Sequence, residues 1–213
     1  MKRSLYMISL HLVLVLLSSS IAQKVQWKRS EAPVSHLQLF HSTHVINLPT
    51  SETHQQGDFE FEISHRFVPA IEEGYKSFWG LDGPANIRLA FAYAPTDEMI
   101  LTLGRTNVNN NLDLQVRYQL LSIESDLLPL LGSANLGAAW NSYIGDRPNG
   151  DSRNFQYYAQ FAVNTLLFDK LGLGVVPSYL YNSAILYEDI KKSVTMGTYI
   201  QYYFSPLWSL LLE

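Results

Sequence analysis

Apolar and polar side chains largely alternate along GDFEFEISHRF, residues 57–67. Phe59 and Phe61 fall on one parity, and Glu60 and Glu62 fall on the other. Successive side chains of an extended chain point to opposite faces, so the pattern predicts a β-strand with one apolar and one charged face. The architecture then depends on which of these two faces meets the interior of the protein.

Further segments of this kind follow one another to the end of the chain, with turn-rich pieces between most of them and no helical period. Short connections between successive strands are typical of antiparallel neighbours, because parallel neighbours need long crossovers. The expected strands are 37–49, 58–68, 85–95, 99–106, 111–123, 132–144, 153–168, 171–183 and 194–205.

The fold class predicted from this pattern is all-β, an antiparallel up-and-down transmembrane β-barrel of about 10–12 strands. A tenth strand begins near Leu207 and is interrupted at Glu213. Bacterial single-chain barrels have an even strand count, so we expect that the last strand or strands are missing here. A natural ten-stranded end at Glu213 is the alternative.

The apolar parity identifies the orientation of this barrel. A soluble barrel turns its apolar face inward, whereas a membrane barrel turns it towards lipid. Several predicted strands reach the roughly 9–11 residues that cross a bilayer, and charge does not interrupt their apolar rows. We therefore expect these side chains to face lipid: Phe59, Phe61, Ile63, Leu89, Phe91, Leu114, Val116 and Phe161.

Aromatic and charged residues add detail to this orientation. Tyr and Trp near the ends of predicted strands suit the two membrane interfaces, and we assign Trp79, Tyr93, Tyr118, Trp140 and Tyr143 to them. The opposite parity carries the charges that we expect in the lumen, namely Glu60, Glu62, Arg66, Arg88, Asp113 and Arg117. These charges either bias permeation as an eyelet or neutralise one another in a filled, narrow lumen.

Composition agrees with a membrane location. Only 16% of residues are charged, against roughly 25% in ordinary soluble domains. The net charge of −4 argues against a nucleic-acid partner. Residues 1–22 have a basic start, an apolar core and small residues before a cleavage point, which predicts a signal peptide. Residues 23–36 then form a periplasmic leader, and 37–213 the barrel domain.

Three runs carry a resemblance to a known family. TxVINL…GxFEFxISHRF spans Thr43 to Phe67, FWGLDGPANIRLAFAYAPTD spans Phe78 to Asp97, and LDLQVRYQLL spans Leu112 to Leu121. They resemble a family of Gram-negative outer-membrane β-barrel proteins catalogued only as a domain of unknown function. The resemblance implies the barrel fold and the cell outer membrane, and it supplies no catalytic residues.

Catalytic chemistry is not expected. Ser64 and His65 are neighbours in a strand, so they point to opposite faces and cannot form a dyad, and no GxSxG is present. His44 and His65 are possible cross-strand neighbours, but no third metal ligand is evident. We expect no enzyme activity, no metal and no cofactor.

The predicted function is a narrow pore or a structural component of the outer membrane. Its expected partners are outer-membrane lipid and the insertion machinery, and the solute is unknown. The alternative is a soluble periplasmic β-barrel that binds an apolar small molecule. With a strand at 37–49 and a periplasmic N-terminus, the long connection 72–84 would also be periplasmic, which leaves short outer loops.

Overall fold

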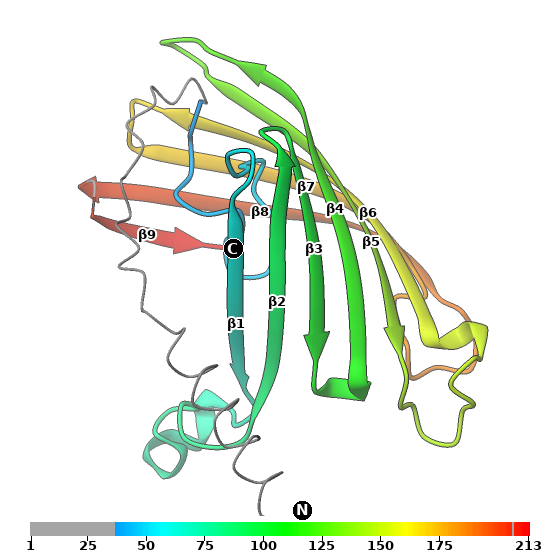
Figure 1. Ribbon diagram of the computed structural model, residues 1–213. Coiled ribbons are helices and arrows are strands. Elements are labelled where there is room, and N and C mark those ends of the chain that lie inside the picture. Colours follow the sequence, from blue (N-terminus) through cyan, green and yellow to red (C-terminus); the bar gives the residue numbers. More distant parts are fainter. Residues whose placement is uncertain (1–36, 206) are drawn as a thin grey trace, which may run out of the picture. The chain divides into compact units, whose positions relative to one another are not determined.

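The computed structural model describes residues 37–205 and 207–213, so the predicted signal peptide and leader lie outside the described part. Within these residues, nine strands form one antiparallel sheet in which each strand pairs with the next along the chain (Figure 1). The strands are β1 Phe59–Phe67, β2 Ala85–Thr96, β3 Met99–Thr106, β4 Asn111–Ile123, β5 Leu130–Asn141, β6 Phe155–Leu167, β7 Leu171–Tyr181, β8 Lys192–Ser205 and β9 Trp208–Leu212. This meander confirms the predicted all-β, up-and-down class.

The sheet is not closed: within the described residues, β1 pairs only with β2 and β9 only with β8. In the described part of the chain, helical structure is limited to short 3₁₀ turns at Ile71–Ser77 (η1), Val108–Asn110 (η2) and Ser152–Asn154 (η3). Within the described ranges, no helix has the length and apolar character needed to cross a membrane.

The two faces of the sheet differ as the alternation predicts. In β2, Ala90 and Ala94 are buried, whereas Leu89 and Phe91 on the opposite parity are 43% and 62% exposed. The face that carries the small and polar side chains is called the inner face, and the face that carries the large apolar side chains is called the outer face. Large exposed hydrophobic residues on one face are the pattern of a sheet that meets lipid.

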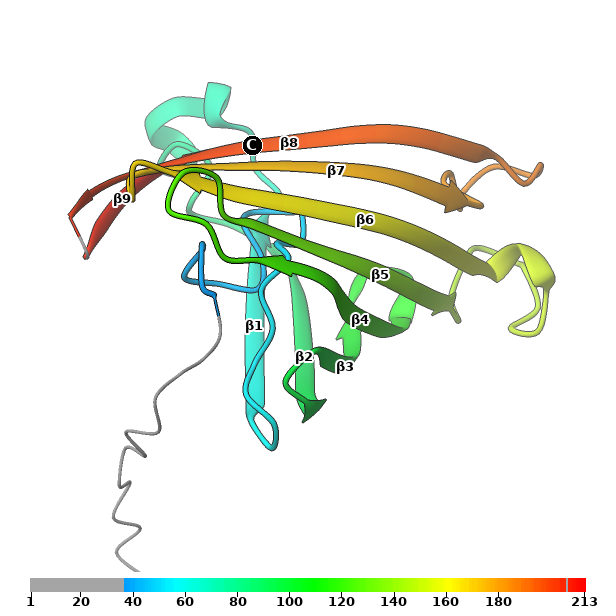
Figure 2. The ribbon, with the colours of Figure 1, turned by 90° about the horizontal axis from the view of Figure 1, so that it is seen from above.

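The prediction of a strand at 37–49 is wrong. The only pairing there is an isolated bridge between His44 and Pro49, closed by a tight turn in which Val45 N donates to Leu48 O at 3.0 Å. Residues 37–52, called the inner segment below, instead lie on the concave, inner side of the sheet (Figures 1 and 2). Burial against the sheet outweighs the strand propensity of the sequence here.

The connections fall into two groups by the end of the sheet at which they lie, and the three longest are all at one end. At one end, called the loop end, they are 68–84, 107–110, 142–154 and 182–191. At the other end, called the turn end, residues 97–98, 124–129 and 168–170 connect successive strands. Because 37–49 is not a strand, the chain enters β1 from the turn end. The connection 72–84 therefore lies at the opposite end from that entry, which reverses the expectation stated above.

Candidate functional site

The inner segment is anchored by a compact hydrophobic cluster. Leu39 and Phe40 are 3% and 1% exposed and pack with Leu131, Ala162, Val176 and Tyr199 of the inner face. The rings of Phe40 and Tyr199 meet edge to face, with centroids 5.4 Å apart. The backbone N–H groups of Leu39 and Phe40 both donate to Glu52 Oε1, at 2.9 and 2.8 Å. The segment thus folds back on itself before it meets the sheet.

Glycines of β7 and β8 provide the space that this cluster needs. A Cβ atom at Gly172 would lie 2.8 Å from Phe40 Cζ, and one at Gly197 would lie 2.5 Å from Leu48 Cδ1. Both distances are too short for carbon atoms in contact, since dispersion contacts are optimal near 3.5–4.0 Å. Gly172 and Gly197 are therefore seats for side chains of the inner segment.

Arg117 of β4 is the central polar anchor of the inner segment. Its side chain is 2% exposed, and Nη1 donates to Thr43 O at 2.8 Å and to Glu52 O at 3.1 Å. Nη2 lies 3.3 Å from His44 Nε2. An arginine has a fixed fork of five N–H donors, so one side chain holds both ends of the stretch between Thr43 and Glu52. Arg117 was predicted as a lumen charge, and its role in binding the inner segment was not predicted.

Further hydrogen bonds attach the inner segment to β6 and β8. Ser51 N donates to Asn164 Oδ1 at 2.5 Å, and Ser51 Oγ donates to Ala162 O at 2.8 Å. Tyr199 donates its hydroxyl hydrogen to Pro49 O at 3.2 Å. Ala162 lies in a gap of the β6–β7 ladder, between the pairs Gln160–Ser178 and Val163–Val175. This gap coincides with Pro177, which has no N–H to donate to a ladder.

The carboxylate of Glu213 binds the turn of the inner segment at residues 46–48. Oε2 accepts hydrogen bonds from the backbone N–H groups of Ile46, Asn47 and Leu48 at 3.0, 2.7 and 3.1 Å, and Oε1 accepts from Asn47 Nδ2 at 2.8 Å. His54 Nε2 lies 2.6 Å from Glu60 Oε2 of β1. The chain before β1 thereby contacts both open edges of the sheet.

The predicted lumen charges all lie on the inner face, and the structure brings three of them together. Arg88 Nη2 lies 2.7 Å from Asp113 Oδ1, and Arg88 Nη1 lies 3.4 Å from Glu62 Oε2. Glu60 instead contacts His54, and Arg117 contacts the inner segment. Arg66 is exposed, and its side chain makes no hydrogen bond or ion pair with the described residues. Of the two alternatives for these charges, the geometry agrees with mutual neutralisation around Arg88.

Rows of amide side chains cross the inner face beside these charges. Gln115 Nε2 donates to Asn135 Oδ1 at 2.7 Å, and Asn135 Nδ2 donates to Gln160 Oε1 at 2.9 Å. Gln160 Nε2 continues the row to Ser178 Oγ at 3.2 Å. Buried polar groups are costly unless they are paired, and these rows pair across four strands. The row was not predicted, although Gln and Asn recur at these parities in the sequence.

The residues predicted to face lipid lie on the outer face. Their exposed fractions are 79% for Phe59, 52% for Phe61, 53% for Ile63, 43% for Leu89, 62% for Phe91, 53% for Leu114 and 41% for Phe161, and Val116 is half-buried. Neighbouring outer-face rings also meet, as Phe61 and Phe91 do with centroids 4.7 Å apart. Their contact with lipid stays a prediction.

The aromatic residues assigned to the interfaces divide between the two ends. Tyr93 and Tyr118 lie towards the turn end, where Phe59 stacks on Tyr93 with centroids 4.6 Å apart. Trp79, Trp140 and Tyr143 lie towards the loop end. Trp140 is half-buried, and its Nε1 donates to Asn149 O at 2.9 Å. The interfacial role of these residues stays a prediction, while their separation into two bands agrees with it.

The possible histidine pair does not form. His44 belongs to the inner segment, whereas His65 is exposed on β1 opposite Ile87. The expected pairing assumed that 37–49 was a strand, and it fails with that strand. Within residues 37–205 and 207–213, no group of three or more His, Asp or Glu side chains could hold a metal ion.

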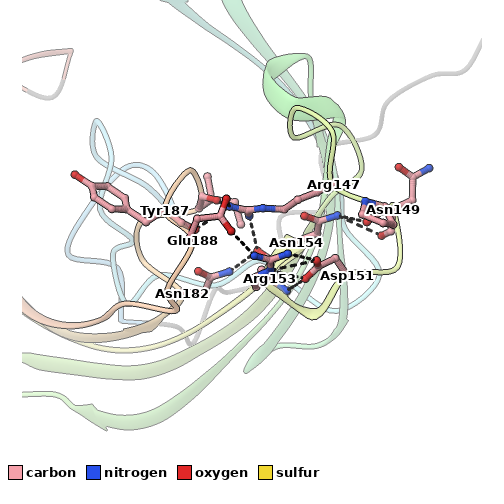
Figure 3. A network of polar contacts seen from close by, with 10 residues as sticks. Arg147, Asn149, Asp151, Arg153, Asn154, Asn182, Tyr187 and Glu188 are labelled. Carbon is pink, nitrogen blue, oxygen red and sulfur yellow. Dashed lines mark hydrogen bonds and ion pairs between the residues drawn. The ribbon is translucent and has the colours of Figure 1, made fainter.

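Two loops at the loop end are joined by a network of polar contacts (Figure 3). Arg147 donates from Nη1 to Ile185 O at 2.9 Å and from Nη2 to Tyr187 O at 2.7 Å. Arg153 binds Asp151, with Nη2 2.6 Å from Oδ2, and also contacts Glu188. The hydrogen bonds from Arg153 lower the pKa of the Asp151 carboxyl. Loop 142–154 therefore holds loop 182–191 in place.

We expect Arg147→Ala to release loop 182–191. The Arg147 side chain is 9% exposed, and hydrogen bonds from a charged donor each contribute about 1.5–3 kcal/mol. Backbone amides of 184–188 should exchange hydrogen at least about tenfold faster, because a loss of about 1.4 kcal/mol corresponds to tenfold. Lys191→Ala is the matched control, since Lys191 is half exposed and lies 3.8 Å from Asp189. Equal exchange in both variants would show that Arg147 does not hold the loop.

A polar cavity of about 730 Å³ lies on the inner face in the half nearest the loop end. The turn of the inner segment from His44 to Pro49 lines one side of it, and β1 to β4, β6 and β7 contribute residues to the others. The ion pair of Arg88 and Asp113 projects into this cavity. The inner face therefore combines an occupied part, beneath the inner segment, with an open polar part beside it.

Comparison with known proteins gives one family for this arrangement. A family model described as "Membrane bound beta barrel domain (DUF5777)" matches residues 40–213, which include most of the inner segment and all nine strands. No curated protein and no solved structure matches the chain. The inner segment is thus part of the matched domain, together with the sheet that it covers. The chain belongs to this family of membrane-bound β-barrel domains, whose function is unknown.

Proposed function

We propose that the protein is a non-enzymatic barrel of a Gram-negative outer membrane and that its inner segment closes the lumen. The observation that carries this proposal is the burial of residues 39–40, 43 and 50–52 against the inner face by Arg117 and the hydrophobic cluster. A segment held by buried hydrogen bonds and packed rings obstructs passage along the face that it covers. The protein then acts as an occluded pore in its resting state, not as an open channel.

The orientation in the membrane follows from the two groups of connections. Outer-membrane barrels have short periplasmic turns and longer extracellular loops. By this rule the turn end faces the periplasm, and the loop end, with its Arg147 and Arg153 network, faces the outside. The inner segment then enters the lumen from the periplasmic side, and the polar cavity opens towards the outside.

The soluble alternative has no support in the geometry. A carrier of apolar small molecules needs an apolar interior, whereas the inner face of this sheet is lined by charges and amides. Its large apolar side chains, such as Phe61 and Phe91, are exposed on the outer face. Such a surface is unsuited to water in a soluble monomer.

Two measurements test the proposal. After cell fractionation, the full-length protein should be recovered with the outer membrane and should migrate faster on an unheated gel than on a heated one. In planar bilayers the same protein should give no ohmic steps, because its lumen is closed. Recovery in the soluble periplasm would overturn the location, and frequent steps from the unmodified protein would overturn the closure.

A further inference from the structure

The polar cavity beside the inner segment differs from ordinary small-molecule pockets in its lining. Its volume of about 730 Å³ falls within the roughly 300–1,000 Å³ that ligand pockets occupy. Most such pockets are lined mainly by apolar side chains. Here every lining residue is polar or charged except Val45, Ile46, Pro49, Val108 and Leu180. Polar and apolar atoms contribute about equally to the lining surface, so a solute that fits this cavity must carry both polar and apolar groups.

The charges of the cavity are balanced, so they do not favour a charged solute. Two arginines, Arg66 and Arg88, and two carboxylates, Glu62 and Asp113, line it. Both carboxylates lie within 3.4 Å of an Arg88 nitrogen, so each already forms an ion pair within the protein. A solute with a net charge would gain little from a neutral set and would lose its own hydration. The balance favours a neutral solute.

The wall formed by β1, β2 and β3 offers hydrogen-bonding groups that the protein itself does not use. Within the described part of the chain, the side chains of Arg66, Asn86 and Thr106 make no hydrogen bond or ion pair. Arg66 lies directly opposite Asn86 in the ladder, and Thr106 lies opposite Arg88. Together they present donors from Arg66, both donors and an acceptor from Asn86, and a hydroxyl from Thr106.

The opposite wall contributes an aromatic ring. Tyr158 of β6 lines the cavity and points inward beside Gly137 of β5, where any Cβ atom would overlap the tyrosine ring. An aromatic ring offers a flat apolar surface to the C–H groups of a solute, while the amides and the hydroxyl offer hydrogen bonds to its O–H groups. This combination of surfaces suits a solute that carries both C–H groups and O–H groups on each of its faces.

We propose that this cavity binds a neutral, hydroxyl-rich solute of the size of a mono- or disaccharide. Hydroxyl groups both donate and accept, so they match amide and hydroxyl side chains without a charged partner. The proposal goes beyond closure of the lumen, because a site of this kind binds its solute in detergent whether or not the barrel conducts. Its failure would leave the occluded pore untouched, and the absence of occlusion would leave the site untouched.

The test uses full-length, detergent-purified protein and saturation-transfer NMR with four probes. Maltose and glucose are the neutral probes, and glucuronate and glucosamine are the negatively and positively charged counterparts of glucose. We expect transfer to maltose and glucose and little or none to the two charged sugars. Transfer mainly to glucuronate would overturn the proposal in favour of an anion site at Arg66, and no transfer to any probe would overturn it outright.

Substitutions of cavity residues test whether maltose binds in this cavity. Asn86→Leu and Thr106→Val remove hydrogen-bonding groups that have no partner within the described residues, so the sheet should fold unchanged. The double variant should weaken maltose binding about tenfold, which corresponds to two ordinary hydrogen bonds. Thr96→Val is the matched control, because Thr96 is an exposed threonine at the turn end of β2, the strand that carries Asn86, and lies outside the cavity. Equal maltose binding by the double variant and the control would place the site elsewhere and sink the proposal. Arg66→Leu provides a second, independent variant with the same expectation.

Discussion

Gly172→Val combined with Gly197→Val is expected to expel the inner segment and open the barrel. Valine at these positions would place methyl groups where Phe40 and Leu48 now lie, since even a Cβ atom would come within 2.8 and 2.5 Å of them. Overpacking of this kind costs about 1–3 kcal/mol for each site. Valine also favours β structure over glycine, so the strands themselves should be preserved. In planar bilayers we expect stepwise conductance from the double variant and none from the unmodified protein.

A compensating change distinguishes expulsion of the inner segment from damage to the sheet. Phe40→Ala and Leu48→Ala remove the side chains that collide with the new valines, so the quadruple variant should again be closed. Leu173→Val serves as a control in β7, because Leu173 lies between Gly172 and Gly174 on the opposite parity. Conductance that persists equally in the quadruple variant would mean that the valines disrupt the wall, and the role of the glycine seats would be refuted.

Arg117→Met is expected to release the stretch between Thr43 and Glu52. Methionine fills much of the same volume but leaves the carbonyls of Thr43 and Glu52 without the guanidinium that now lies 2.8 and 3.1 Å away. Hydrogen bonds from a charged donor contribute about 1.5–3 kcal/mol each, so the loss of these two should weaken the attachment by about 3 kcal/mol. Limited proteolysis of protein in vesicles should then cleave within 43–52 much faster than in the unmodified protein.

Arg117→Lys and Arg105→Met complete this experiment. Lysine keeps the charge but lacks the planar fork, so Arg117→Lys should lie between the unmodified protein and Arg117→Met in cleavage rate. Arg105 is exposed on β3, and its Nη2 contacts Asn110 Oδ1 at 3.4 Å, so Arg105→Met should leave the rate unchanged. If Arg117→Met resists proteolysis as well as the unmodified protein does, Arg117 is not the anchor of the inner segment.

The sequence predicts the sheet well because its strands obey a local rule. Alternation of period two along 111–123 or 153–168 is sufficient to locate β4 and β6 to within a few residues. The same parity places Phe61 and Leu114 on the outer face and Glu62 and Asp113 on the inner face. Strand order follows from the short connections, since only antiparallel neighbours are compatible with them.

The inner segment could not be found by the same rule. Residues 37–49 alternate like a strand, yet Leu39 and Phe40, on opposite parities, are both buried. Their position depends on packing against side chains such as Tyr199, which lies more than 150 residues further along the chain. The signals that do exist in the sequence are small residues on the inner parity of β7 and β8, such as Gly172 and Gly197. Glycine within a strand marks a close approach of another part of the structure.

The pairing of charges on the inner face could be predicted from the sequence only in general terms. The sequence indicates that Glu62, Arg88 and Asp113 share one face, but the pairing of Arg88 with both carboxylates depends on strand register and on the bare Cα of Gly104, where any side chain would overlap Arg88 and Asp113. Register is fixed by the whole sheet, not by any one strand. The same holds for the amide row through Asn135, whose members come from four strands.

The central claim, that the outer face meets lipid while the inner face is closed, can be tested with two spin labels. The chain contains no cysteine, so Leu114→Cys and Gln115→Cys each give one labelling site on adjacent residues of β4. In lipid vesicles the label at 114 should collide readily with oxygen, which dissolves in hydrocarbon, and rarely with a water-soluble nickel chelate. The label at 115 should be shielded from both. A label at 114 that meets the chelate more often than oxygen would contradict the account.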